Sequence, residues 1–121
     1  MKAYFARPIS QYNTPKDARD LALVKRLFDE IVDPNTPEFQ AAYKVLGMKV
    51  FIDAVKECDA IIFRSFANGI IPAGVAKEVQ AAYDADLIVL EIPSYIEGRT
   101  LSVLDTRAYL IELSKGSNKE D

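Results

Sequence analysis

The sequence of 121 residues contains no histidine and a single cysteine, Cys58. Without histidine the chain has no Ser-His-Asp or Cys-His catalytic group and lacks the ligands of the usual zinc sites. One cysteine allows no disulfide within the chain, and Cys58 lies in an apolar stretch, so we expect it to be a small buried side chain. Any acid–base chemistry must therefore come from aspartate, glutamate, tyrosine, lysine or cysteine.

Long apolar runs and concentrated positive charge are also absent. Charged residues interrupt every apolar run well short of a membrane span, and the first residues, Met1 to Phe5, lack the pattern of a signal peptide. Lysine and arginine are scattered and the net charge is −3, so a nucleic-acid polymer is not an expected ligand. We expect a cytoplasmic protein that binds neither nucleic acid nor membrane, although one or two local cations would be enough to hold a single phosphate.

The length fits one domain that is large enough to bury a core. Buried strands are predicted at residues 2–6, 60–63 and 87–92, with a short extended stretch at 32–35. Helical patterns alternate with these strands. This alternation predicts an α/β fold: a single-domain, Rossmann-like (flavodoxin-like), mostly parallel sheet with helices on both faces.

The helices are predicted from capping signals and apolar spacing. Thr14 followed by Pro15 marks the start of the first helix, whose apolar stripe continues to Ile31. The other predicted helices cover residues 36–46, 49–58 and 74–83, and a last one starts near residue 105 after a turn at Gly98. Residues 1–115 are expected to form the domain, and residues 116–121 a polar C-terminal tail.

In such sheets a ligand lies at the carboxyl ends of the strands. One loop there contains Asn68 and Gly69 and leads into a helix at Gly74, whose free N–H groups favour an anion. Glu78 follows one helical turn later, and small residues at the helix start leave room for a ligand. A glutamate at such a place is often a solvated surface residue, and that alternative stays open.

Two further carboxylates, Asp53 and Asp59, precede the same loop. Two carboxylates beside a glycosidic bond suit a mechanism in which one acts as nucleophile, or stabilises an oxocarbenium ion, and the other donates a proton. Asp59 also has a structural alternative, as a residue that caps or pairs at the start of a strand.

Four segments, in order, resemble one enzyme superfamily. They are Ala-Tyr-Phe-Ala-Arg-Pro-Ile at 3–9, Asp-Ala-Ile-Ile at 59–62, Gly-Val-Ala-Lys-Glu-Val-Gln-Ala-Ala at 74–82, and Gly-Arg-Thr-Leu-Ser at 98–102. The first three resemble the first strand and loop, the Asp-Ala/Val-Val-Val strand and the Gly-x-x-x-Glu-x-x-x-Ala helix of the nucleoside 2-deoxyribosyltransferase superfamily. The fourth is similar to the Gly-Arg-Val-Leu-Ser segment of its 2′-deoxynucleoside 5′-monophosphate N-glycosidase branch.

The resemblance implies a site for a nucleoside or nucleotide. Glu78 would be the nucleophile or oxocarbenium stabiliser, Tyr4 would position it, and Asp53 would give a proton to the leaving base. Arg99 and Ser102 would bind a 5′-phosphate across the interface of a homodimer or larger assembly. No cofactor and no metal is implied. We expect the substrate to contact Phe5, Arg7, Pro8, Ile9, Ser10, Asp59, Asn68, Gly69, Gly74, Arg99 and Ser102.

Two residues depart from the pattern of the family. Arg7 stands where the family usually has glycine, and it would either bring a cation to the phosphate or fill the pocket. Pro72 stands where the monophosphate hydrolases have a phosphate-binding serine, and proline lacks even the N–H donor. The expected activity is that of an N-glycosidase or a deoxyribosyltransferase. The alternatives are a non-catalytic nucleotide-binding protein, for sensing or sequestering, and a structural α/β domain. Arg99 and Ser102 also have an alternative without a ligand, as residues of a surface turn and of a strand.

Overall fold

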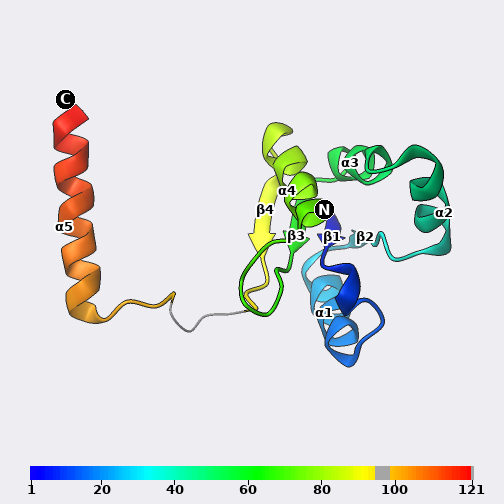
Figure 1. Ribbon diagram of the computed structural model, residues 1–121, viewed down its shortest axis with the longest axis horizontal. Helices are drawn as coiled ribbons and strands as arrows, with labels where there is room; N and C mark the ends of the chain where they lie inside the picture. Colours follow the sequence, from blue (N-terminus) through cyan, green and yellow to red (C-terminus); the bar gives the residue numbers. More distant parts are fainter. Residues whose placement is uncertain (95–98, 121) are drawn as a thin grey trace.

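The computed structural model describes residues 1–94 and 99–120. Within them, four strands form one all-parallel sheet in the order β2 (Glu30–Val32), β1 (Lys2–Ala6), β3 (Ala60–Phe63), β4 (Ile88–Glu91). Helices cover both faces of this sheet: α1 lies on one side, and α3 and α4 lie on the other (Figure 1). The predicted α/β, Rossmann-like architecture is therefore confirmed.

The first helix is shorter than the sequence predicts. α1 covers Pro15–Leu27 and is capped by Thr14, whose hydroxyl accepts a hydrogen bond from the Asp17 N–H at 3.2 Å. The prediction that the helix runs to Ile31 is wrong, because the chain becomes extended at Phe28 and Ile31 pairs with Ala3 in the sheet. Phe28 and Ile31 still pack on the same core as α1, so the stripe marked their burial but not their backbone conformation.

The next helices follow their capping signals. α2 (Pro37–Leu46) begins after Thr36, which accepts a hydrogen bond from the Phe39 N–H, and it ends at Gly47, whose φ of +69° favours glycine. α3 covers Lys49–Lys56 and α4 covers Ala73–Asp84, close to their predicted bounds. One turn of 3-10 helix, Ile9–Gln11, lies in the loop after β1.

The core has one cluster on each face of the sheet. The larger cluster lies under α3 and α4 and includes Tyr4, Ile61 and Val79. The smaller one lies under α1 and is formed by Phe5, Val24 and Ile62. Side chains alternate between the two faces along each strand. The opposite directions of Tyr4 and Phe5 follow from this alternation, and they bring Tyr4 to the side of α4.

The last helix stands apart from these layers (Figure 1). α5 covers Val103–Glu120, so it begins two residues before the predicted start and includes residues 116–120 of the predicted polar tail. Gly98 and Asp121 lie outside the described residues. The residues from Val103 to Gly116 are all exposed. In the described part of the chain, no helix has both the length and the apolar content needed to cross a membrane.

Candidate active site

Glu78 and Tyr4 meet beneath the start of α4. Glu78 is only 7% exposed and Tyr4 is fully buried, and the Tyr4 hydroxyl donates a hydrogen bond to Glu78 Oε2. Tyr4 reaches this position from the middle of β1, because its side chain points to the face that α4 covers. The structure thus brings together the two residues that the resemblance places side by side. The alternative in which Glu78 is a surface residue is wrong, because α4 turns this side chain towards the sheet.

Burial sets the charge state of Glu78. Removal from water raises the pKa of its carboxyl group to about 7, although the Tyr4 hydrogen bond and the positive charge of Arg7 both act to lower it. Burial and the neighbouring Glu78 charge raise the pKa of Tyr4, so Tyr4 stays protonated as a donor. At neutral pH the site therefore holds a carboxyl group that exists in both forms beside a neutral phenol.

Glu78 lines a cavity of about 410 Å³. A cavity of this size fits a ligand of a few hundred daltons. Its lining comes from the loop after β1, the β2–α2 connection, α2, the start of α3, and the segment from β3 into α4. The lining residues are Arg7, Pro8, Ile9, Ser10, Tyr12, Pro34, Gln40, Tyr43, Met48, Phe51, Phe66, Pro72, Gly74, Val75 and Glu78.

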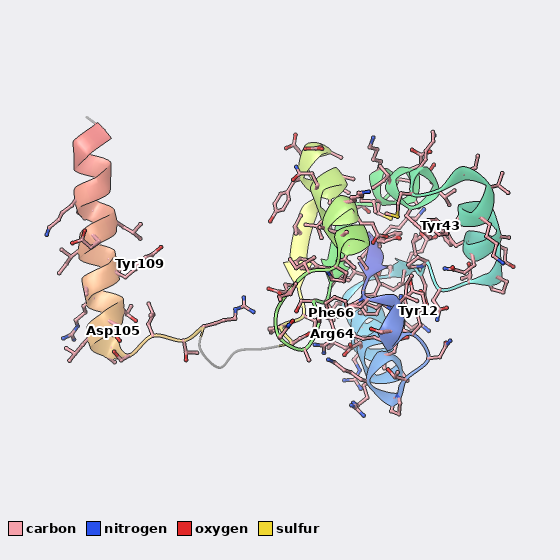
Figure 2. The ribbon with its side chains drawn as sticks, viewed as in Figure 1. Tyr12, Tyr43, Arg64, Phe66, Asp105 and Tyr109 are labelled. Atoms are coloured by element: carbon pink, nitrogen blue, oxygen red, sulfur yellow. The ribbon has the colours of Figure 1, made fainter. Side chains whose placement is uncertain are left out.

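Aromatic rings form much of this lining. Tyr12, Tyr43 and Phe66 come from three different segments of the chain (Figure 2). The Tyr43 ring stacks on Phe51, with ring centroids 5.3 Å apart. Tyr12 remains protonated, since burial raises its pKa to about 12. Flat apolar faces with a few hydroxyl donors suit a planar heterocycle.

Arg7 is locked within the protein. Its Nε and Nη2 donate to the two carboxylate oxygens of Asp17 at 2.8 and 3.1 Å, and Nη1 donates to Asp33 Oδ1 at 2.6 Å. Longer bonds join Nη1 to the Phe5 carbonyl and Nη2 to Asp33 Oδ2. The guanidinium also lies between the rings of Phe5 and Tyr12, 4.5 and 4.6 Å from their centroids. Its side chain has no exposed surface. A guanidinium has five N–H donors, and the protein accepts all of them, so Arg7 shapes the loop and does not present a free cation.

The structure leaves the other two carboxylates outside the cavity. Asp53 is exposed on α3 and forms an ion pair with Lys49, one turn earlier on the same helix. Asp59 accepts a hydrogen bond from the Lys2 N–H at 2.8 Å and so joins the starts of β1 and β3. It therefore lies at the amino-terminal ends of the strands, whereas the cavity lies at their carboxyl ends. The expectation that Asp53 stands beside Glu78 is therefore not met. Asp59 has the structural role given above as its alternative, that of a residue that pairs at the start of a strand.

The remaining expected contacts divide into two groups. Pro8, Ile9, Ser10 and Gly74 line the cavity, as the sequence predicts. Phe5 packs on the opposite face of the sheet and under Arg7. Four expected contacts lie outside the cavity lining of the single chain: Asn68, Gly69, Arg99 and Ser102. The Asn68 side chain accepts a hydrogen bond from the Ile70 N–H, and Arg99 donates one to Glu91. The Ser102 hydroxyl accepts a hydrogen bond from the Asp105 N–H at the start of α5.

The aromatic residues of the wall are missing from the expected contacts. Tyr43 and Phe51 look like ordinary core positions of two helices in the sequence. Their signal is a pair of closely spaced helices, 37–46 and 49–56, that carry aromatic residues and pack against each other. A scan against protein-family models and a search of curated proteins found no match to the chain.

Replacing Glu78 with glutamine is expected to stabilise the protein at pH 8 but not at pH 4. The raised pKa means that the folded state holds this proton more tightly than the unfolded chain, whose ordinary value is 4.5. Wild-type stability therefore falls as the pH rises from about 4.5 to about 7 and is then level. The variant lacks this loss, so its advantage grows to about 3 kcal/mol at pH 8. Urea unfolding across pH measures it, with exposed Glu57→Gln as the control. A pH-independent difference contradicts the burial of this charge.

Asp53→Asn is expected to change activity by no more than about threefold, because an exposed ion pair one turn along a helix contributes little. The measurement is the rate of base release under the conditions used for the wild type. A loss of more than tenfold would return Asp53 to the role of proton donor that the resemblance implies.

Proposed function

We propose that this protein cleaves the N-glycosidic bond of a nucleoside or nucleotide, with Glu78 as the nucleophile. The observation that carries the proposal is a buried glutamate, held by Tyr4, on the wall of an aromatic cavity of about 410 Å³. Burying a carboxyl group without an ion pair costs stability, and such groups are concentrated at functional sites. The fold places this glutamate where ligands of parallel sheets bind, beyond the carboxyl ends of the strands.

In the proposed reaction, a carboxylate oxygen of Glu78 attacks C1′ of the sugar while the C1′–N bond breaks. The base leaves with the electron pair of that bond and takes a proton from solvent. Water, or a second base, then attacks C1′, the C1′–O bond to Glu78 breaks to free the carboxylate, and the attacking group gives its proton to solvent. Tyr4 fixes the rotamer of Glu78 through Oε2, which leaves the other oxygen for attack. Tyr43, Phe51 and Phe66 supply apolar faces for the base.

The test is the release of free base from a panel of ribonucleosides, deoxyribonucleosides and their 5′-monophosphates, at pH 8, with and without a second base as acceptor. Release from at least one substrate is expected. Product formed only with an acceptor assigns a transferase, and product formed without one assigns a hydrolase. The absence of release from every substrate contradicts the proposal.

A second candidate function is a non-catalytic nucleoside-binding protein. It is favoured by one observation: among the described residues, Glu78 is the only carboxylate on the cavity lining, so no second acid stands ready to protonate a leaving base. A thermal shift separates the candidates when no base is released. A ligand at a hundred times its Kd stabilises the folded state by about 2.7 kcal/mol. A shift without base release assigns the binding protein.

A further inference from the structure

The charged groups around the cavity bear on whether its ligand can carry a phosphate. Among the described residues, Arg7 is the only cation on its lining, and its five N–H donors are all taken by protein oxygens. Two aspartates, Asp17 and Asp33, hold this one guanidinium. With Glu78 ionised, this group of four side chains has a net charge of −2.

Among the described residues that line the cavity, those at the start of α4 form the one feature that would attract an anion. Gly74 and Val75 line the cavity near the beginning of the helix, and Pro72 provides no side-chain cap. A helix N-terminus corresponds to about half a positive charge. Three carboxylates against one guanidinium outweigh that half charge, and a monophosphate at pH 8 would itself bring nearly two negative charges. Repulsion therefore dominates for a phosphorylated ligand.

We propose that the substrate class is the uncharged nucleoside and not its 5′-monophosphate. This inference rests on the proposed function and narrows its substrate. Asp33 makes the net charge of Arg7 and its partners negative. Asp17 alone already pairs with the Arg7 guanidinium through two bonds, and the partly exposed Asp33 adds a second carboxylate to the same guanidinium.

The test compares kcat/KM for each nucleoside with that for its own 5′-monophosphate at pH 8. We expect a preference of at least tenfold for the nucleoside, and we expect Asp33→Asn to reduce it at least threefold, since asparagine keeps an oxygen for Arg7 but removes one charge. Glu38→Gln, an exposed change of the same charge on α2, should leave the preference unchanged. A monophosphate used as well as its nucleoside, or a preference unaffected by Asp33→Asn, overturns the inference while base release upholds the proposed function. No release from either compound overturns both.

A separate observation concerns α5 and a bare part of the sheet. Leu90 pairs with Ile62 in the sheet, so it lies on the α1 face, yet it is 40% exposed, and Ile88 on the same face is 46% exposed. The neighbouring flank of α1 carries exposed Leu23 and Leu27. Asp20 lies on that flank and forms an ion pair with Arg64 at the end of β3, which turns the flank towards β3 and β4. We name Leu23, Leu27, Ile88 and Leu90 the open face.

α5 carries an exposed apolar surface of the kind that could cover the open face. Leu110 and Leu113 follow Val103 along one side of the helix, and Ile111 follows Leu104 along another, and all five are at least half exposed. An apolar stripe on a helix normally packs against another part of a protein. The two rows lie on neighbouring sides of the helix, roughly 100° apart.

We propose that α5 of a second copy of this chain lies on the open face, reciprocally, in a two-fold dimer. One apolar row then packs on β4 and α1 of the partner, and the second row packs on the partner's α5 near the symmetry axis. The position of α5 away from its own sheet agrees with this exchange (Figure 1). Two-fold dimers are the commonest closed assembly of identical chains.

Light scattering at micromolar concentration tests the dimer, and cysteine pairs test the exchange. Wild type should have the mass of two chains, and Leu90→Asp or Leu110→Asp should weaken association at least a hundredfold. The control is Tyr83→Asp, at an exposed position of α4, which should leave association unchanged. Mixed Leu90→Cys and Leu110→Cys chains should form a reducible dimer; Cys58 does not compete, since burial raises the pKa of its thiol to about 11. A monomeric wild type overturns the proposal. So does a chain that carries both Leu90→Cys and Leu110→Cys and forms the disulfide within itself, when the mixed single variants form none.

Discussion

Glu78→Gln is expected to lower the rate of base release by at least about a thousandfold, which corresponds to about 4 kcal/mol of activation free energy. An amide has almost the volume of the carboxyl group and still accepts the Tyr4 hydrogen bond, but it is not a nucleophile towards C1′. The Kd for the nucleoside should stay within a few fold of the wild-type value. Single-turnover release at pH 8 and calorimetric titration measure the two quantities.

The matched control is Glu57→Gln, the same change at an exposed position at the end of α3. It should leave both quantities unchanged. If Glu78→Gln retained more than a tenth of the wild-type rate, the Glu78 carboxylate would not be the group that bonds to the sugar, and base release would proceed by another mechanism.

Arg7→Met is expected to destabilise the fold by about 3–5 kcal/mol. The substitution keeps a long side chain between the Phe5 and Tyr12 rings but leaves Asp17 buried without its partner. Removal of one member of a buried ion pair has this cost because the remaining charge loses its compensation. Urea unfolding at pH 7 measures the loss as a lower midpoint with an unchanged slope.

Two further variants separate this effect from a general loss of an arginine. Arg26→Met, on the exposed side of α1, should change stability by no more than about 0.5 kcal/mol. Asp17→Asn added to Arg7→Met should recover part of the loss, because it removes the uncompensated charge. If Arg7→Met cost less than 1 kcal/mol, Arg7 would not be held as the structure has it, and its charge would be available to a ligand.

The sequence predicts the elements whose signals are local. The apolar run at residues 60–63 and the Thr-Pro starts of α1 and α2 need no distant partner, and the structure has β3 and both helices there. Ile31 is different. Its spacing continues a helical stripe, and pairing with β1, a segment distant in sequence, decides that the chain is extended at this residue.

The candidate site divides in the same way. Glu78 and Tyr4 stand in segments with a recognisable pattern, and β1 and α4 bring them into contact. The cage around Arg7 needs Asp17 from α1 and Asp33 from the β2–α2 connection, and nothing in the local sequence of either aspartate indicates that they converge. The resemblance implies Asp53 because it lies in the helix before the Asp-Ala-Ile-Ile strand. The rotation of α3 decides its direction, and that rotation turns Phe51 inward and Asp53 outward.

The central claim is that Glu78 bonds to the sugar, and mass spectrometry of the rapidly quenched protein tests it most directly. A nucleoside that the protein cleaves, bearing fluorine at C2′ to slow the release of the sugar, is mixed with wild type and with Glu78→Gln. We predict that wild type gains the mass of one sugar residue, on the peptide that contains Glu78, as the base is released, and that the variant gains none. Base release with the sugar on another residue, or on none, would contradict the account.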